Sequence, residues 1–316
     1  MKTTIRTMLL FLVFALPARA YTTFDFLEIG FGAASSGLGQ AAVAESGSLE
    51  GVWHNPATLA ALTGPGFSGS VNPYLGMTLW SAAASLKPSS HVTLAASGCG
   101  LAIEGITGDI LYNGDPGRSI RTGITSGGIS AAFALGAAAK WPFRLDLGIK
   151  GKIVTETLDQ TPLSAFLLNA GLALAFPGAF AREGSLQFGF IARNIGRGGV
   201  PGQPDVIPLS LLVGTAYVLP LGKKVALKAL VDGDLTVADQ TMRLSTGVEA
   251  FLFQFLTARA GYLFDNAQSA RGLSLGAGIQ FPIAHFDGHL DYALQPLEGL
   301  GVQQHFQLTL AWNPNK

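Results

Sequence analysis

The stretch "FRLDLGIKGKIV", residues 143–154, alternates between apolar side chains and polar or small ones with a period of two. One face of an extended strand would carry Leu145, Leu147 and Ile149, and the other Asp146, Gly148, Lys150 and Lys152. A helix is a poor alternative because Gly148 and Gly151 are weak helix formers. The stretch therefore predicts a β-strand with one apolar face and one polar face.

The same alternation recurs in "GSLQFGFIAR" (184–193), "MRLSTGVEAF" (242–251), "GLSLGAGIQF" (272–281) and "HFQLTLAW" (305–312). Clusters of turn-forming residues separate such segments at 88–90, 113–117, 196–208, 222–223, 232–234 and 265–271. The longest polar stretches, 104–128 and 194–208, are expected to be outer loops. The rhythm gives about fourteen or fifteen strands, and bacterial single-chain barrels are normally even-numbered, so we expect about fourteen.

Composition indicates the environment of these strands. Charged residues make up 13% of the chain, against about 25% in an average protein, and 41 of the 316 residues are glycine. The best candidate for a transmembrane helix, residues 165–181, contains Asn169 and Pro177 and is a poor one. A soluble β-sandwich would alternate too, but its second face would carry more polar residues than are found here. In lipid every backbone polar group needs an internal partner. The sequence thus predicts an all-β fold, a transmembrane antiparallel barrel over residues 65–316.

Residues 1–20 have the three-part order of a secretory signal peptide. The basic start, the apolar core and the cleavage site are Lys2 with Arg6, Met8–Leu16, and Ala18-Arg19-Ala20. We expect the mature chain to begin at Tyr21 and to lie in the outer membrane of a bacterial cell. Its single cysteine, Cys99, cannot form an intramolecular disulfide.

Residues 21–64 do not follow the strand rhythm. They are rich in glycine and small residues and contain "VWHNPATLAAL" (52–62), where Asn55-Pro56 interrupts regular structure before an apolar helical run. Asn55 can hold a turn through its side chain, and Pro56 suits the first position of a helix. Since about eight strands already fill with side chains, a wider barrel would leave a channel, and this segment is expected to plug it. An ordinary N-capped surface helix is the alternative.

Three patches carry a family resemblance: "GLGQAAVAESGSLEGVWHNPATLAAL" (37–62), "ARNIGRGGVPGQPDVIPLSLLVGTAYVL" (192–219) and "DYALQPLEGLGVQQHFQLTLAW" (291–312). Together they resemble the long-chain fatty acid outer-membrane transporter (FadL) superfamily, most closely its PorV/PorQ-like and spirochaetal UPF0164 branch. Two features depart from the branch. His54 separates Trp53 from Asn55, and the chain ends "WNPNK" instead of on an aromatic residue.

The resemblance implies an N-terminal hatch that contains a short helix and gates the barrel. Its hatch residues would be Gly37, Gly39, Trp53, Asn55, Pro56 and Ala57. The implied function is passive uptake of small hydrophobic molecules, such as long-chain fatty acids, which leave when the hatch shifts. Lateral release into the bilayer is implied in the same way.

Few charged residues are expected to face the lumen, and most of them are basic. The candidates for the ligand path are Lys150, Lys152, Arg193, Lys228, Arg243 and Arg259. These cations could hold an acidic headgroup while alanines and leucines accept an apolar tail. Alternatively, they pair with acids such as Asp146, Asp232 and Glu249 and only stabilise the lumen.

Other functions have weaker signals. A PorV-like docking protein for secreted or periplasmic proteins would use the loops at 104–128 and 194–208. A barrel lipase would use Ser274 of Gly272–Gly276, although G-x-S-x-G needs a strand–turn–helix context. His285 and His289 are interpreted as rim or lumen residues and not as metal ligands, and no cofactor is expected. A net charge of zero without a basic stripe argues against nucleic acid. The expected partners are a hydrophobic small molecule or lipid and the outer-membrane lipids.

Overall fold

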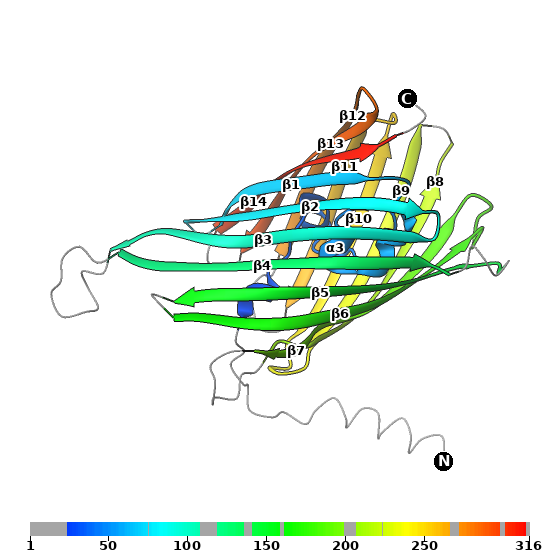
Figure 1. Ribbon diagram of the computed structural model, residues 1–316. Helices are drawn as coiled ribbons and strands as arrows, with labels where there is room; N and C mark the ends of the chain where they lie inside the picture. Colours follow the sequence, from blue (N-terminus) through cyan, green and yellow to red (C-terminus); the bar gives the residue numbers. More distant parts are fainter. Residues whose placement is uncertain are drawn as a thin grey trace, which may run out of the picture.

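The fold is a closed barrel of fourteen antiparallel strands (Figure 1). In this computed structural model each strand pairs with its neighbour in sequence, and β1 pairs with β14 to close the ring. The described residues are 24–74, 76–107, 119–135, 141–158, 161–198, 207–222, 224–265, 272–297 and 301–313. The all-β class, the antiparallel pairing and the strand number were predicted from the alternation and are confirmed. The predicted signal peptide and the mature start at Tyr21 lie outside the described residues.

The strands are β1 (Gly66–Tyr74), β2 (Met77–Ser89), β3 (Val92–Thr107), β4 (Ser119–Ala134), β5 (Arg144–Leu158), β6 (Thr161–Pro177), β7 (Ser185–Gly198), β8 (Ser210–Pro220), β9 (Val225–Thr236), β10 (Met242–Leu252), β11 (Leu256–Asp265), β12 (Gly272–Ile283), β13 (Phe286–Leu297) and β14 (Gly301–Trp312). Because Gly66 pairs with Ala311, β1 begins and β14 ends at the same end of the barrel. We call this the Trp312 end and the opposite one the Tyr74 end.

The N-terminal segment, residues 24–64, precedes the barrel strands. It contains η1 (Asp25–Glu28), α2 (Ala33–Gly37), α3 (Gly51–His54) and η2 (Pro56–Ala61). The α2 helix contacts β11 to β14, and η2 contacts β3 to β6 on the other side of the ring. Figure 1 shows α3 within the ring of strands, in agreement with these contacts. None of the helices in the described part of the chain has the length and apolarity needed to cross a membrane.

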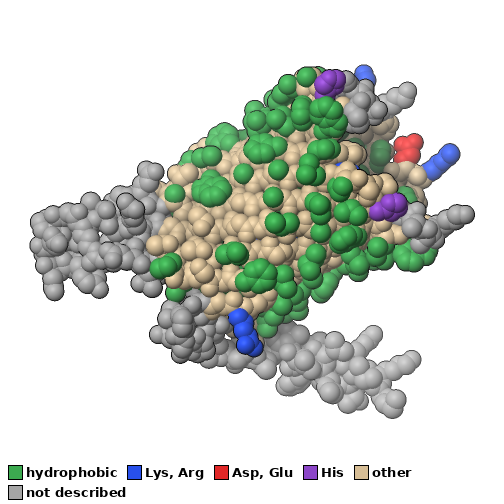
Figure 2. Space-filling view, viewed as in Figure 1, with side chains coloured by type: hydrophobic (Ala, Val, Ile, Leu, Met, Phe, Trp, Pro, Cys, Tyr) green, Lys and Arg blue, Asp and Glu red, His purple; other side chains and the backbone are tan. Residues whose placement is uncertain are grey.

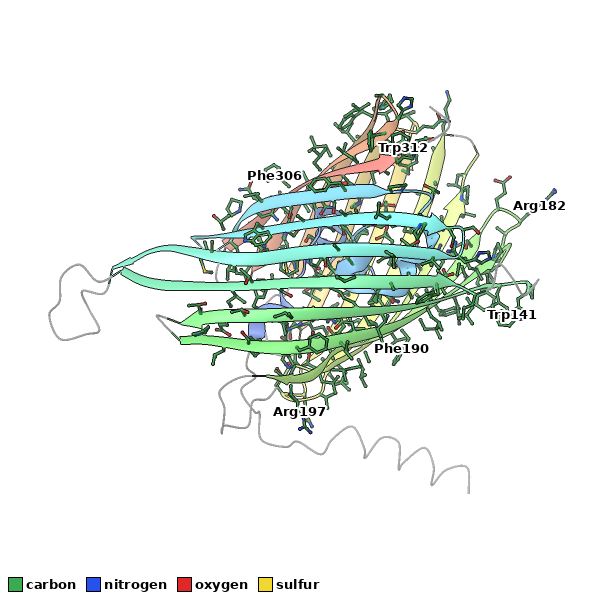
Figure 3. The ribbon with its side chains drawn as sticks, in the orientation of Figure 1. Trp141, Arg182, Phe190, Arg197, Phe306 and Trp312 are labelled. Atoms are coloured by element: carbon green, nitrogen blue, oxygen red, sulfur yellow. The ribbon has the colours of Figure 1, made fainter. Side chains whose placement is uncertain are left out.

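Side chains alternate between the two faces of the wall, as the period of two requires. On β5, Ile149 and Ile153 are 47% and 58% exposed, while Lys150 between them is 4% exposed. On the side of the molecule seen in Figure 2, hydrophobic side chains are spread over the wall and the few visible charges lie toward its ends. Figure 3 shows Phe190 and Phe306 pointing away from the wall. The outer face is therefore apolar and the inner face polar.

Aromatic side chains gather near both ends of the wall. At the Trp312 end, Trp141 stacks on Phe143 at 5.1 Å between ring centroids, and Phe286 meets Trp312 edge-on at the same separation. Nearer the Tyr74 end, Tyr262 lies 4.4 Å from Phe264. Tyr292 and Phe306, 4.7 Å apart, lie near the middle of β13 and β14. Two such girdles flank the apolar band of transmembrane barrels, where ring edges meet lipid headgroups.

The expected loop at 104–128 is wrong for most of its length. Strand β3 continues to Thr107, and β4 begins at Ser119; only 108–118 lie outside the described residues. Within the stretch, Ser126 is an inward position of β4 with a small hydroxyl, and the alternation continues beyond it with Ile129 outward and Ser130 inward. The loop expected at 194–208 is likewise shorter, since β7 runs to Gly198.

A second correction concerns Asp232-Gly233-Asp234, which has the composition of a turn but lies inside β9. Both aspartates point into the lumen and find partners there, so the strand accommodates them. Asp232 accepts hydrogen bonds from the backbone N–H of Ala42 and Val43, and Asp234 forms an ion pair with Arg193.

Candidate functional site

Asn55 connects the N-terminal segment to the barrel wall. Its Oδ1 accepts a hydrogen bond from Ala57 N at 3.1 Å, which caps η2, and Pro56 follows at the first helical position. The Nδ2 group donates to Val43 O at 3.0 Å and to Leu172 O of β6 at 3.1 Å. One fully buried side chain thus joins two parts of the segment to the wall.

Glycines on the inner face let the backbone of the segment approach the wall. A side chain at Gly148 would overlap the backbone of Ala57, and one at Gly189 would overlap Val43. The inward glycines that meet the segment in this way are Gly148, Gly171, Gly189, Gly214, Gly247, Gly261 and Gly276. Sequence reasoning did not use them, although a glycine at an inward position of an alternating strand is a readable signal of close approach.

The two predicted hatch glycines, Gly37 and Gly39, belong to the segment and make the same kind of close backbone contact with the wall. Gly37 faces Gly276 of β12, so that a Cβ there would lie 3.0 Å from the Gly276 Cα. Gly39 has φ of +65° and lies against Tyr262 of β11, and both constraints favour glycine. Trp53 packs against Phe31, with 5.2 Å between the ring centroids. The predicted hatch residues thus lie on the part of the segment that contacts the inner wall.

The inward cations of β9 to β11 are paired with carboxylates. Lys228 lies 2.6 Å from Glu45 of the segment and 2.8 Å from Glu249. Arg259 lies 2.6 Å from both Glu249 and Asp291. This chain of ion pairs, Glu45–Lys228–Glu249–Arg259–Asp291, is the paired cluster. It matches the structural alternative raised from the sequence.

Arg243 and Arg193 also have acidic partners. Arg243 contacts Glu28 of the segment and lies 3.2 Å from Asp265, while Arg193 lies 2.9 Å from Asp234. Of the acids proposed from sequence, Glu249 has the predicted role and Asp146 pairs with Arg144 instead. Asp232 binds backbone amides of the segment and was missed as a site residue.

Lys150 and Lys152 of β5 differ from the other lumen cations. Their ammonium groups have no carboxylate within 4.0 Å among the described residues. Lys150 Nζ donates to Val52 O at 2.8 Å and lies 4.6 Å from the Trp53 ring centroid. Lys152 Nζ donates to Asn194 Oδ1 at 2.6 Å. Two buried positive charges are therefore compensated only by neutral groups.

These lysines line an internal cavity of about 40 Å³. Its other walls are apolar side chains of the segment, including Phe26, Phe31 and Trp53, with Cys99 and Arg193 from the barrel. Phe26 and Phe31 meet edge-on at 5.6 Å. The cavity thus joins aromatic surface to three cations. Its volume is close to that of one water molecule, so a larger molecule would enter only after the segment moves.

Two titratable groups of the N-terminal segment lie close to this cavity. Burial raises the pKa of Glu50 to about 7, with Glu45 and Asp291 adding to the shift, although Ser35 N donates to its carboxylate at 3.0 Å. Burial lowers the pKa of His54 to about 4, and Arg193 adds to the shift. His54 Nε2 lies 3.0 Å from Phe31 O.

The other sequence candidates are separate from this site. Ser274 lies inside β12, without the strand–turn–helix context that its motif needs, and its side chain is fully buried. His285 and His289 do not share a strand, because β12 ends at Ile283 and β13 begins at Phe286. His285 packs on Trp312 with 5.4 Å between centroids.

Known proteins resemble the chain in fold. No protein-family model matches the sequence, and no curated protein is significantly similar to it. A FadL homologue from Pseudomonas aeruginosa has a TM-score of 0.53 at 10% identity, over 89% of this chain and 98% of that one. The toluene transporter TodX from Pseudomonas putida has a TM-score of 0.54 at 11% identity, over 93% and 98%. The predicted FadL-like fold is thus supported, whereas the PorV/PorQ-like branch stays a prediction.

Proposed function

We propose that the chain is an outer-membrane channel for passive uptake of small hydrophobic molecules, such as long-chain fatty acids, with the N-terminal segment as its hatch. The observation that carries this proposal is the cavity between the aromatic side chains of the segment and the cations of β5 and β7. The apolar outer face and its aromatic girdles support a place in the membrane. A solved structure of the same fold is a toluene transporter.

The cavity is too small for a fatty acid while the segment is in place, so binding requires the segment to move; the chemistry of the cavity lining then suits the two ends of such a ligand. Phe26, Phe31 and Trp53 offer apolar contact to the hydrocarbon tail. The ligand carboxylate would give Lys150 and Lys152 of β5 the counter-charge that the described residues do not supply. A ligand carboxylate would replace neutral oxygen acceptors with a full counter-charge in a buried site, where ion pairing is strongest.

Ligand binding and hatch movement share Lys150 in this proposal. Its ammonium group holds Val52 O, three residues before the Asn55 corner. A carboxylate that takes Lys150 removes this bond, and the wall then holds the corner chiefly through Asn55 and Leu172 O. Residues 51–57 shift as a result and open the lumen.

The orientation follows from the connections between strands. The β3–β4 and β7–β8 connections lie at the Tyr74 end and are the longest. Long connections face the cell exterior in such barrels. Ligand therefore enters from the Tyr74 end, and it leaves toward the Trp312 end or laterally into the bilayer. The docking role remains the alternative prediction, because the central parts of its loops, 108–118 and 199–206, lie outside the described residues.

The test is fatty-acid uptake into proteoliposomes, together with native mass spectrometry of protein extracted in mild detergent. We expect a lipophilic adduct on the unmodified protein and altered uptake in Asn55→Ala and Pro56→Ala. Asn313→Ala is the control, since Asn313 bonds to Asp287 at the Trp312 end, away from the segment. Unchanged uptake in both corner variants would contradict the hatch, and an empty barrel with a co-extracted protein would favour docking.

A further inference from the structure

A line of uncharged polar side chains follows the inner face of β1 and β14. We call it the polar stripe; its members are Ser68, Ser70, Asn72, Gln303, His305, Gln307 and Thr309. Ser68 pairs across the strands with Thr309, and Ser70 with Gln307. The stripe reaches from Gln303, near the Tyr74 end, to Thr309, near the Trp312 end. It therefore runs along most of the lumen.

Some polar atoms of the stripe have no hydrogen-bond partner among the described residues. Both ring nitrogens of His305, which is 1% exposed, lack one, and so does Gln303 Nε2. On β12, which β13 separates from β14, the fully buried Ser274 hydroxyl also lacks one. Buried polar groups are nearly always hydrogen-bonded, to protein or to water. Several such atoms on β12 and β14 point to a place where water, or a molecule with the same kind of hydrogen-bonding groups, can bind.

The chemistry of the stripe defines its guest. Its hydroxyl, amide and imidazole groups donate and accept hydrogen bonds but carry no formal charge. The nearest ionic groups on β11 and β13, Arg259 and Asp291, are paired with each other at 2.6 Å. The stripe itself supplies no counter-charge to an ion, and a hydrocarbon would leave its polar atoms unsatisfied. An uncharged molecule with hydroxyl or amide groups satisfies both conditions.

The N-terminal segment covers the stripe. Ala33 N donates to Gln307 Oε1 at 3.1 Å, and Gln40 Nε2 donates to Gln295 Oε1 of β13 at 3.0 Å. Gln295 pairs across the strands with Gln303, so Gln40 lies next to the part of the stripe that lacks partners. Displacement of α2 and Gln40 would uncover these groups.

We propose that the polar stripe is a second ligand track, which takes small uncharged molecules that carry hydroxyl or amide groups, of the size of glycerol or urea. The track rests on the proposed function in one respect, because the same movement of the segment uncovers it. It is distinct from the lysine cavity in position, on β1 and β14 instead of β5, and in chemistry.

The experiment measures osmotic swelling of proteoliposomes in glycerol and in urea, with fatty-acid uptake recorded on the same preparation. The test variant is Gln303→Leu/His305→Leu, and the control is Gln304→Leu. Gln304 is the next residue of β14, but it faces outward and is exposed. We expect the control to swell like the unmodified protein. The test variant should swell about tenfold more slowly, which corresponds to a loss of about 1.4 kcal/mol of hydrogen bonding between the guest and these two side chains.

The outcomes separate this inference from the proposed function. Swelling of unmodified protein at the rate of protein-free vesicles, while fatty acid is taken up, would overturn the track alone. Equal swelling of test variant and control would do the same. Swelling without fatty-acid uptake would support the track and contradict the proposed substrate. If the test variant does not fold, His305→Leu is compared with His305→Gln, which keeps hydrogen-bonding capacity and is expected to restore swelling.

Discussion

Inward cations on β9 to β11 each touch at least one carboxylate, whereas the two inward lysines of β5 touch only neutral oxygens. Both groups face the lumen and come from the same alternating pattern, although the β5 lysines are the more deeply buried group. The sequence left two roles open for lumen cations, stabilisation by pairing or binding of an acidic ligand. The comparison assigns the pairing role to the cations of β9–β11. Binding of an acidic ligand is then left to the lysines of β5. The two groups of cations thus differ in whether a carboxylate compensates their charge, and not in whether they face the lumen.

The largest effect is expected from breaking the paired cluster. Replacement of Glu249 by leucine leaves Lys228 and Arg259 with one acidic partner each, Glu45 and Asp291. Removing one partner of a buried ion pair typically costs about 3–5 kcal/mol. We expect a loss of that size in the free energy of unfolding, measured by urea titration of the refolded barrel. A loss below about 1 kcal/mol would show that the cluster does not stabilise the lumen.

A pH experiment sharpens the comparison. The N-terminal segment contacts both groups of cations, and the shifted pKa values of its Glu50 and His54 make its docking on the wall depend on pH. The pKa of Glu50 is raised from 4.5 to about 7, so docking weakens as the pH rises through this window. The pKa of His54 is lowered from 6.5 to about 4, so docking weakens as the pH falls. Each shift corresponds to about 3 kcal/mol. The two opposite slopes nearly cancel in the unmodified protein.

The variants separate these slopes. In Glu50→Gln, docking should weaken as the pH falls from 6.5 toward 4, since only His54 titrates. In His54→Gln it should weaken as the pH rises from 4.5 to 7. Hydrogen exchange of the amides of residues 33–58 measures both. The two variants control for each other. If protection changes with pH in the same direction in both, the assignment of the two pH dependences to Glu50 and His54 is wrong.

A smaller effect is expected at Asp232 of β9. This carboxylate holds the segment through backbone N–H groups and not through an ion pair. Its Oδ2 accepts from Ala42 N at 2.6 Å and from Val43 N at 2.8 Å. Asp232→Ala removes both bonds and should lower segment stability by about 2 kcal/mol, given the usual worth of hydrogen bonds to charged groups. Protease cleavage near residues 42–47 should become faster. Asp234→Ala breaks the ion pair with Arg193 and should leave cleavage there unchanged.

The smallest stability effect is expected on β5. Lys150→Met and Lys152→Met replace an unpaired buried charge by an apolar side chain of similar length, and each should change stability by less than about 1 kcal/mol. Fatty-acid retention should nevertheless fall, while retention of an uncharged hydrocarbon such as toluene should not. Native mass spectrometry compares the two ligands. Equal loss of both would mean that the lysines shape the cavity and do not hold a carboxylate.

The alternation in residues 143–154 is enough to predict the barrel, because a period of two fixes which side chains share a face. It also places Lys150 and Lys152 inside, as observed. Strand ends were predicted less well. Small hydroxyls such as Ser126 look like loop residues in sequence but face the lumen of a long strand. Composition cannot distinguish the two, since both environments favour small polar groups.

Partner choice was beyond sequence reasoning for a different reason. Glu249 and Asp232 are equally plausible partners for a lumen cation, and only the cross-strand register places Glu249 between Lys228 and Arg259. The close approach of the segment at Gly148 was readable, however. A glycine between Asp146 and Lys150 on the inner face indicates that another backbone comes near.

The hydrogen bond from Ala33 N to Gln307 Oε1 joins residues 274 positions apart in the chain. Its consequence concerns the order of assembly. Ala33 leaves the ribosome long before Gln307 and cannot reach its partner until the last strand exists. Contacts between distant residues form slowly, because a long loop must first be closed. The N-terminal segment is therefore among the first parts of the chain to be made and among the last to be ordered. Until β14 pairs with β1, the N-terminal segment must be prevented from aggregating with other chains.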